Sequence, residues 1–132
     1  RLFLLGIPTP RPLAYLDEYR GPLLHRSYFI AEFVPGQGLH GILKDANVPE
    51  HRKRQIIDEV VRTLDRLASH GISHGDLKHT NILCRENTIV LADLDGMEIH
   101  RIAWVQRRRH RRDMARFHRD VAASPKLADH PV

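Results

Sequence analysis

The stretch that decides the fold is S-H-G-D-L-K-H-T-N-I-L-C, residues 73–84. Its first part is polar and its end is apolar, which predicts a polar loop that leads into a short strand. A turn at residues 85–87 precedes a second short strand at residues 88–92, so the two strands are expected to form a hairpin. The loop and the hairpin bring four polar side chains into one small volume: Asp76, Lys78, Asn81 and Asp93.

These four side chains suit the transfer of a phosphoryl group. Two carboxylates and an amide oxygen are ligands for a hard divalent cation such as Mg²⁺. A lysine two residues after an aspartate neutralises phosphate charge, and the other carboxylate accepts the proton of a hydroxyl group. Phosphoryl transfer needs mainly such positioning and charge neutralisation. The alternatives are a chance grouping of these residues in an unrelated fold and a fold that holds them without activity.

The clearest helix precedes the polar loop and covers residues 48–70. Its apolar residues recur at helical spacing and form one face, which predicts packing against a core. Asn47 is expected to cap the helix, with Glu50 as the returning partner of a capping box. Gly71 is expected to end the helix in the left-handed conformation. The apolar positions of this face are Ile56, Ile57, Val60, Val61, Leu64, Leu67 and Ala68.

The N-terminal third has the composition of extended structure. Its prolines at positions 8, 10 and 12 disfavour helix and predict a rigid extended segment. A later run, S-Y-F-I-A-E-F-V, is rich in aromatic and β-branched residues and predicts a strand. The expected elements are the end of a helix or strand at residues 1–5, strands at residues 13–17 and 27–34, a turn at residues 18–22 and a short helix at residues 39–44.

The C-terminal part predicts a basic helix over residues 102–123. The chain has 21 Lys and Arg and 16 Asp and Glu, a net charge of +5. Residues 98–120 carry this whole excess, with 8 basic and 3 acidic side chains. Such a patch is either a solvated helix face or a contact site for a phosphorylated glycolipid, a membrane surface or nucleic acid. Candidate core contacts of this helix are Trp104, Val105, Met114, Phe117 and Val121.

Composition excludes several classes of protein. A chain of 132 residues forms one domain at most, and 42% hydrophobic residues argue against a disordered chain. The sequence contains no run of 18 apolar residues, so it predicts no transmembrane helix. The single Cys84, a small core residue of the expected hairpin, excludes an internal disulfide. The histidines lack the spacing of a zinc site, and we expect surface positions for most of them, such as His51 and His100.

The motif residues resemble the catalytic segments of kinases. The sequence H-G-D-L-K-H-T-N at residues 74–81 is similar to the catalytic loop H-R-D-x-K-x-x-N, and D-L-D-G at residues 93–96 is similar to D-F-G. Gly75 in place of the arginine is typical of small-molecule and glycolipid kinases, and it suggests that no phosphorylated activation loop controls the site. Three features resemble the lipopolysaccharide kinase family, which contains Kdo and heptose kinases. They are H-G-D-L-K-x-x-N-I-L, the D-x-D in place of D-F-G, and the Arg-rich helix with R-R-D-M-A-R-F at residues 111–117.

The resemblance implies an α+β, protein-kinase-like fold and a role for each motif residue. The fold would contain the last strands and hinge of an N-lobe and a mainly helical C-lobe with the catalytic-loop hairpin. Asp76 would orient and deprotonate the acceptor hydroxyl, and Lys78 would contact the γ-phosphate of ATP. Asn81 and Asp93 would bind Mg²⁺, and His74 would be a structural residue of the loop. Asp95 either contacts a second metal ion or the substrate, or it is a plain turn residue.

Residues 27–36 resemble the fifth strand and hinge of a kinase, the segment that holds adenine. By this resemblance Ala31 is a small gatekeeper, and the backbone of Glu32 and Val34 hydrogen-bonds adenine. The apolar floor of an N-lobe is expected to be exposed on residues 27–34. Residues 6–16 are similar to the segment that enters the fourth strand in sugar kinases of this type.

Several kinase features are missing from the sequence. No Gly-rich loop is present, and neither is the strand lysine with its partner helix glutamate. The chain begins with Arg1, and its only methionines are Met97 and Met114. We therefore expect an N-terminally truncated piece of a longer protein, or a processed product, that is inactive alone. In this division residues 1–34 are an N-lobe remnant with the hinge, and residues 35–132 are a C-lobe with its basic helix.

The leading hypothesis is an ATP-dependent kinase for a sugar hydroxyl of a lipopolysaccharide core, on Kdo or heptose. Arg107, Arg108 and Arg109 are candidate contacts for an anionic substrate or for the inner membrane, so the expected location is the cytoplasm, including the cytoplasmic face of that membrane. Nucleic acid is a less favoured partner, because no aromatic residues alternate with these arginines. Two alternatives stay open: a kinase for another small alcohol or a protein, and a catalytically dead module that binds anionic glycolipid.

Overall fold

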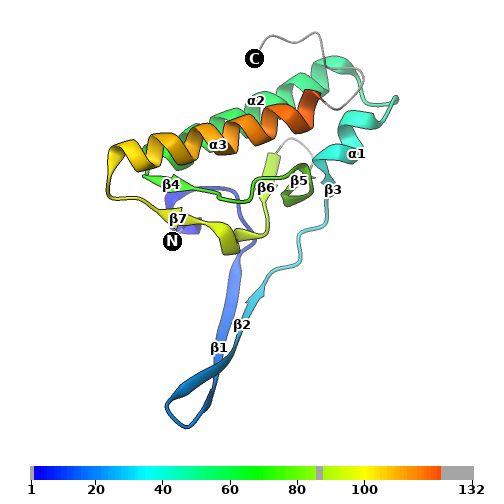
Figure 1. Cartoon of the computed structure of the whole chain (residues 1–132). Coiled ribbons are helices and arrows are strands. Elements are labelled where there is room, and N and C mark those ends of the chain that lie inside the picture. Colours follow the sequence, from blue (N-terminus) through cyan, green and yellow to red (C-terminus); the bar gives the residue numbers. More distant parts are fainter. Residues whose placement is uncertain (1, 86–87, 123–132) are drawn as a thin grey trace.

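The computed structural model describes residues 2–85 and 88–122 and combines two long helices with short antiparallel sheets (Figure 1). This mixture confirms the predicted α+β class. In chain order the elements are the 3₁₀ turn η1 (Phe3–Leu5), β1 (Pro12–Arg20), β2 (Leu23–Ala31), β3 (Gln37–Gly38), α1 (Leu39–Lys44), α2 (Glu50–Ser69), β4 (Ile72–Ser73), η2 (His79–Asn81), β5 (Ile82–Arg85), β6 (Thr88–Leu91), η3 (Leu94–Gly96), β7 (Glu98–Ile99) and α3 (Ala103–Ala122).

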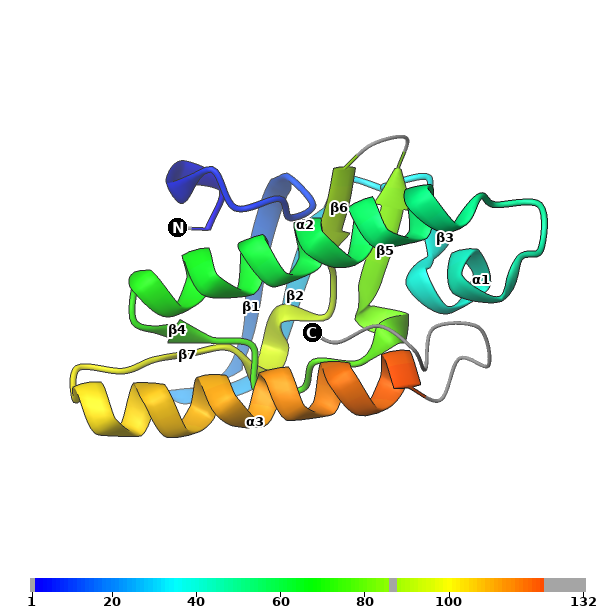
Figure 2. The same ribbon diagram turned by 90° about the horizontal axis from the view of Figure 1, so that it is seen from above.

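The two long helices form one side of the body. Helices α2 and α3 lie side by side and run in opposite directions (Figure 2). The predicted apolar face of α2 is confirmed, with Val61 and Ala68 half-buried at its edge and the other five positions buried. Across the described residues, no helix has the length and apolarity needed to cross a membrane. The buried core contains Ile7, Leu39, Leu43, Ile56, Ile57, Val60, Leu64, Leu67, Ile72, Leu77, Ile82, Cys84, Ile89, Leu91, Phe117 and Val121.

The ends of α2 test the capping predictions. The predicted Asn47 cap is wrong, because Pro49 is the N-cap residue and no side chain caps this end. A residue before proline disfavours the helical conformation, so Val48 cannot start the helix. The N–H of Asn47 instead donates to Asp45 Oδ1 at 2.8 Å, within the preceding turn. The prediction for Gly71 is confirmed: its φ is +70°, and a Cβ there would lie 2.9 Å from the carbonyl oxygen of His100.

The sheets are small and antiparallel. The predicted hairpin is present as β5 and β6, and β3 joins it to make a three-stranded sheet in the order β3-β5-β6. A second pair, β4 with β7, joins the end of α2 to the segment before α3. Strands β3, β4 and β7 are each two residues long, which is too short for a periodic sequence pattern to indicate them. Cys84 is a buried residue of β5 as predicted, and burial raises the pKa of its thiol to about 11, so the thiol is protonated and unreactive.

The hairpin of β1 and β2 extends away from the rest of the molecule (Figure 1). Both strands are longer than predicted on the turn side, and the turn contains only Gly21 and Pro22. The second strand ends at Ala31 rather than at residue 34, because its partner strand begins at Pro12 in a segment whose prolines cannot donate to a ladder. The predicted exposure of apolar side chains is confirmed for Tyr28, Phe29, Ile30 and Phe33.

The residues before β1 pack on the helical body. Ile7 is buried in the core, and the carbonyl oxygen of Pro8 accepts a hydrogen bond from the Leu91 N–H at 2.8 Å. Arg66 of α2 donates to the carbonyl oxygen of Gly6 at 3.2 Å. The expected end of a helix or strand is the 3₁₀ turn η1. This segment therefore fixes one end of the projecting hairpin against α2 and β6.

Helix α3 begins one residue after the predicted start and continues to Ala122, and the predicted last residue, Ala123, lies outside the described residues. Phe117 and Val121 are buried, and Met114 is half-buried, as predicted. Trp104 was expected in the core and is 65% exposed, because the first turn of α3 extends past the end of the packed region. The prediction for His100 is also wrong: its side chain is buried, and its Nε2 lies 2.8 Å from Ser73 Oγ, a contact made by the pairing of β4 and β7.

We predict that the two large aromatic residues of α3 differ sharply in their contribution to stability. Phe117→Ala should lower the free energy of unfolding by about 3–5 kcal/mol, because it empties a buried site. Trp104→Ala is the matched control and should change it by about 0.5 kcal/mol or less, since its ring is solvated. Urea unfolding of the complete protein measures both changes. Equal losses would contradict the placement of α3.

Candidate active site

The carboxylate of Asp76 forms ion pairs with two cationic side chains. Its side chain is 37% exposed, and Lys78 Nζ donates to Oδ2 at 2.5 Å. Arg116 of α3 donates from Nη1 to Oδ1 at 2.6 Å. The hydrogen bond from Lys78 lowers the pKa of Asp76 most, desolvation raises this pKa by less, and the charges of Lys78 and Arg116 lower it further. Asp76 is therefore a carboxylate at neutral pH, and it can accept a hydrogen bond from a hydroxyl group.

Asn81 connects the two loops that carry the acidic residues. Its Nδ2 donates to the backbone oxygen of Asp76 at 3.0 Å and to Asp93 Oδ2 at 3.1 Å, and its Oδ1 accepts from Thr80 Oγ1 at 3.2 Å. Asp93 has a φ of +54°, the left-handed region, which non-glycine residues adopt mainly where the surrounding structure requires it. The structure thus brings together the four polar residues that the sequence singled out.

The two loops meet through their backbones at Gly75 and Gly96. Gly75 has a φ of +80°, and a Cβ there would collide with the carbonyl oxygen of Gly96. A Cβ on Gly96 would lie 3.1 Å from the carbonyl oxygen of His74. Any side chain at Gly75 would separate the loops, because both its conformation and its space are restricted. This contact therefore sets how closely Asp76 can approach Asp93.

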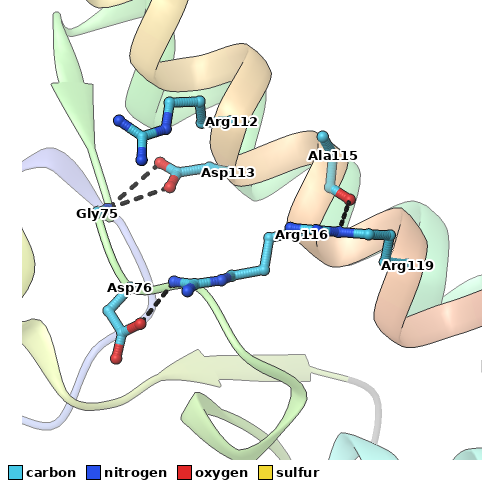
Figure 3. A pocket seen from close by; sticks show the side chains of 7 residues that line it. All are labelled: Gly75, Asp76, Arg112, Asp113, Ala115, Arg116 and Arg119. Carbon is cyan, nitrogen blue, oxygen red and sulfur yellow. Dashed lines mark hydrogen bonds and ion pairs between the residues drawn. The ribbon is translucent and has the colours of Figure 1, made fainter.

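Helix α3 anchors the catalytic-loop segment through two carboxylates. Asp113 is 5% exposed, and its Oδ2 accepts from the His74 N–H at 2.8 Å. The Gly75 N–H donates to Oδ1 of Asp113 at 3.2 Å (Figure 3). Asp120 accepts from the backbone N–H of His79 at 3.0 Å. Sequence reasoning missed the roles of Asp113, Arg116 and Asp120, which lie 38–41 residues from their partners. A signal was present: Asp113, Phe117 and Asp120 share one face at helical spacing.

His74 is buried next to this anchor, as its predicted structural role requires. Its ring is fully covered, and within the described part of the chain neither ring nitrogen has a hydrogen-bond partner. Burial lowers the pKa of His74, and the charges of Asp113 and Asp93 oppose this change. The ring is therefore neutral at pH 7, and it fills space between the loop and the core.

A cavity of about 490 Å³ lies between the projecting hairpin and the loop after β6. The Glu32 N–H donates to the carbonyl oxygen of Arg11 at 2.9 Å, so this amide is already paired. Across residues 2–85 and 88–122, the Glu32 carbonyl and the Val34 N–H make no hydrogen bond. Of the residues expected at adenine, Ala31 lines this cavity, whereas Glu32 and Val34 do not. The cavity is lined by Pro10, Tyr15, Phe29, Ala31, Asp93, Leu94 and Asp95.

A second cavity, of about 570 Å³, is lined by Asp76 and by residues of α3 (Figure 3). Arg108 and Arg109 line a different, smaller cavity beside Trp104, and Arg109 pairs with Glu98 at 3.5 Å. Arg107 is exposed. The structure therefore does not bring the three predicted arginines to Asp76. The second cavity is lined by Gly75, Asp76, Arg112, Asp113, Ala115, Arg116 and Arg119.

Comparison with known proteins finds relatives among kinases. The sequence model of the "Lipopolysaccharide kinase (Kdo/WaaP) family" matches residues 1–130. A probable serine/threonine-protein kinase of Dictyostelium discoideum is 39% identical over 69 residues, 50% of this chain and 15% of that protein. Serine/threonine-protein kinase B of Synechocystis is 29% identical over 93 residues, 68% of this chain and 15% of that protein. The chain thus spans 15% of the length of these relatives, and the partial kinase-like fold predicted from the sequence is confirmed.

The buried His74 predicts how stability depends on pH. Its pKa is lowered in the folded protein, so below about pH 6.5 the unfolded chain binds more protons at this position. Stability should therefore fall as the pH drops from 7.5 to about 5.5, with a contribution of up to about 1.4 kcal/mol per pH unit from His74. His74→Leu should weaken this dependence, whereas the exposed control His51→Gln should not. Urea unfolding at several pH values tests this, and identical slopes for both variants would refute it.

Proposed function

Since the chain belongs to the lipopolysaccharide kinase (Kdo/WaaP) family, we propose that the complete protein transfers the γ-phosphoryl group of ATP to a sugar hydroxyl of a lipopolysaccharide core, on Kdo or heptose. The observation that carries this proposal is the linkage of Asp76, Asn81 and Asp93 by hydrogen bonds of 3.0 and 3.1 Å between two cavities. The cavity lined by Ala31 and Asp93 suits the nucleotide. The cavity lined by Asp76 and α3 suits the acceptor.

In the proposed reaction the acceptor oxygen forms a bond to the γ-phosphorus of ATP. The bond from that phosphorus to the bridging oxygen breaks, and its electron pair leaves with ADP. The hydroxyl proton passes to the carboxylate of Asp76 and then to solvent. Because Lys78 and Arg116 lower the pKa of Asp76, this carboxylate mainly orients the hydroxyl and takes its proton late in the transfer. On this proposal Lys78, which is half-exposed beside Asp76, would contact the γ-phosphate oxygens.

The residues present fit a magnesium ion. Mg²⁺ is usually held by one or two protein oxygens, with phosphate oxygens and waters as the remaining ligands. Asp93 supplies a carboxylate and Asn81 an amide oxygen, and their side chains are 3.1 Å apart. On this proposal they would hold the ion after the amide of Asn81 turns its oxygen toward Asp93. A bound Mg²⁺ would neutralise the charge that develops on the transferred phosphoryl group.

The cavity lined by Ala31 and Asp93 is the proposed place of the nucleotide, next to Glu32 and Val34 in the chain. Ala31 lines it with a small side chain, which leaves room for a base. The carbonyl oxygen of Glu32 and the N–H of Val34 would then pair with adenine. On this proposal residues 1–34 are the end of an N-lobe with the hinge, and residues 35–132 are the C-lobe.

A second candidate is a kinase for another hydroxyl acceptor. It is favoured by the identity to proteins described as serine/threonine-protein kinases. The mechanism would be the same, and only the acceptor would differ. A parallel assay with a lipopolysaccharide core and a generic protein substrate separates the two candidates.

The acidic residues give a direct test. In the complete protein, Asp76→Asn and Asp93→Asn should each lower the transfer of labelled phosphate from ATP to deacylated lipopolysaccharide core by about 100-fold or more, since each removes a carboxylate that the reaction needs. Asp58→Asn changes the same group on the exposed face of α2 and should retain activity. Transfer at full rate by either site variant would overturn the mechanism, and transfer to protein alone would favour the second candidate.

We further propose that the start of α3 contacts an anionic membrane surface. Arg107 and Arg108 are exposed there, and Ile102 and Trp104 expose apolar side chains next to them. Arginines near an anionic surface contribute about 1 kcal/mol each, and tryptophan favours the interface between water and lipid. A protein with this contact would act at the cytoplasmic face of the inner membrane.

Vesicle sedimentation tests the membrane contact. The complete protein should bind vesicles that contain phosphatidylglycerol more strongly than vesicles of phosphatidylcholine alone. The variant Arg107→Glu/Arg108→Glu and the variant Trp104→Ala should each lower this binding about fivefold or more. Arg54→Glu, a charge reversal on the exposed face of α2, is the control. Equal binding by all variants would mean that this part of α3 is only a solvated face.

A further inference from the structure

We propose that the cavity between α3 and the loop of Asp76 binds an anionic group, a phosphate or a carboxylate, that the acceptor carries next to its reactive hydroxyl. This inference rests on the proposed kinase function and narrows its substrate class. The residues assigned to the anionic group are Arg112, Arg116 and Arg119, which line the cavity together with Asp76.

The three arginines converge because of their spacing. Positions 112, 116 and 119 are four and three residues apart, so they share one face of α3. Figure 3 shows Arg112 and Arg116 extending from the helix toward the loop at Gly75 and Asp76. The cavity of about 570 Å³ has the size of a site for a small molecule, such as one or two sugar units.

The positive charge in this cavity is not balanced by the protein. Among the described residues, Arg112 and Arg119 form no ion pair with a carboxylate, and the one hydrogen bond of Arg119 goes to the carbonyl oxygen of Ala115 at 3.3 Å. Asp113 also lines the cavity, but its oxygens accept the backbone N–H groups of His74 and Gly75. A guanidinium group binds a carboxylate or phosphate through paired hydrogen bonds, which fits these unpaired arginines.

Arg116 joins this anion site to the reactive carboxylate. It donates to Asp76 Oδ1 at 2.6 Å and also lines the cavity. An anionic acceptor that approached Asp76 directly would be repelled by it. With Arg116 between the two negative groups, both are attracted to the same cation. The hydroxyl can then reach Asp76 while the anionic group lies toward Arg112 and Arg119.

Binding of simple probes tests the site without catalysis. We would titrate the complete protein with glucose, glucuronate and glucose 6-phosphate at low salt by calorimetry. At least one charged sugar should bind ten or more times more tightly than glucose. The variant Arg112→Gln/Arg119→Gln should lose at least fivefold of this preference. The variant Arg54→Gln/Arg111→Gln removes the same charge from exposed positions that line no described cavity, and it should keep the preference.

Each outcome has a defined meaning. Preference for glucose 6-phosphate identifies a phosphate on the acceptor, preference for glucuronate identifies a carboxylate, and equal binding of both identifies any anionic group. Equal binding of all three sugars, or an equal loss in the control variant, would overturn the proposal. If the double variant unfolds, Arg112→Gln and Arg119→Gln are tested singly, and each should lose part of the preference.

The transfer assay separates this inference from the proposed function. If the site exists, Arg112→Gln/Arg119→Gln should raise KM for the lipopolysaccharide core at least fivefold and leave kcat within about twofold. Unchanged KM with normal transfer would remove the anion site and keep the kinase function. Tight binding of a charged sugar by a complete protein that transfers no phosphoryl group would keep the site and remove the function.

Discussion

The carboxylate of Asp113 is the interaction on which the geometry of the site depends. It is almost fully buried, and it accepts hydrogen bonds from two successive backbone N–H groups, those of His74 and Gly75. Hydrogen bonds to a charged group contribute about 1.5–3 kcal/mol each, and a buried carboxylate without them would be strongly unfavourable. The position of the loop therefore depends on α3, and the position of α3 depends in turn on its packing against α2. This chain of contacts explains how a residue of α3, Arg116, comes to touch Asp76.

The two acidic residues of the site have different electrostatic surroundings. Asp76 is paired with Lys78 and Arg116, and these partners compensate its charge. Among the described residues no cation lies within ion-pair distance of Asp93, which receives only the amide of Asn81. A compensated carboxylate suits the orientation of a neutral hydroxyl, whereas an uncompensated one attracts a metal ion. The carboxylates of Asp76 and Asp93, which lie before and after one short hairpin, thus have two different proposed roles.

The sequence predicted the parts of the structure that depend on local pattern. The apolar face of α2, the β5–β6 hairpin and the proximity of Asp76, Asn81 and Asp93 follow from periodicity and from short spacings along the chain. The ion pair of Arg116 could not be predicted in this way, because it depends on how α3 packs 40 residues away. Trp104 was misplaced for a related reason: periodicity shows which residues of a helix share a face, but not where the core ends along its axis.

The contact between Gly75 and Gly96 limits how this loop can change in evolution. Kinases of the H-R-D type carry an arginine at the position of Gly75, and phosphorylation of the activation loop controls protein kinases. Here a side chain at position 75 would meet a φ of +80° and the backbone of Gly96. A single substitution therefore cannot introduce that arginine without moving the loop that carries Asp93. Control by phosphorylation would require coupled changes in two segments, so the closeness that assembles this site also makes that form of regulation difficult to acquire.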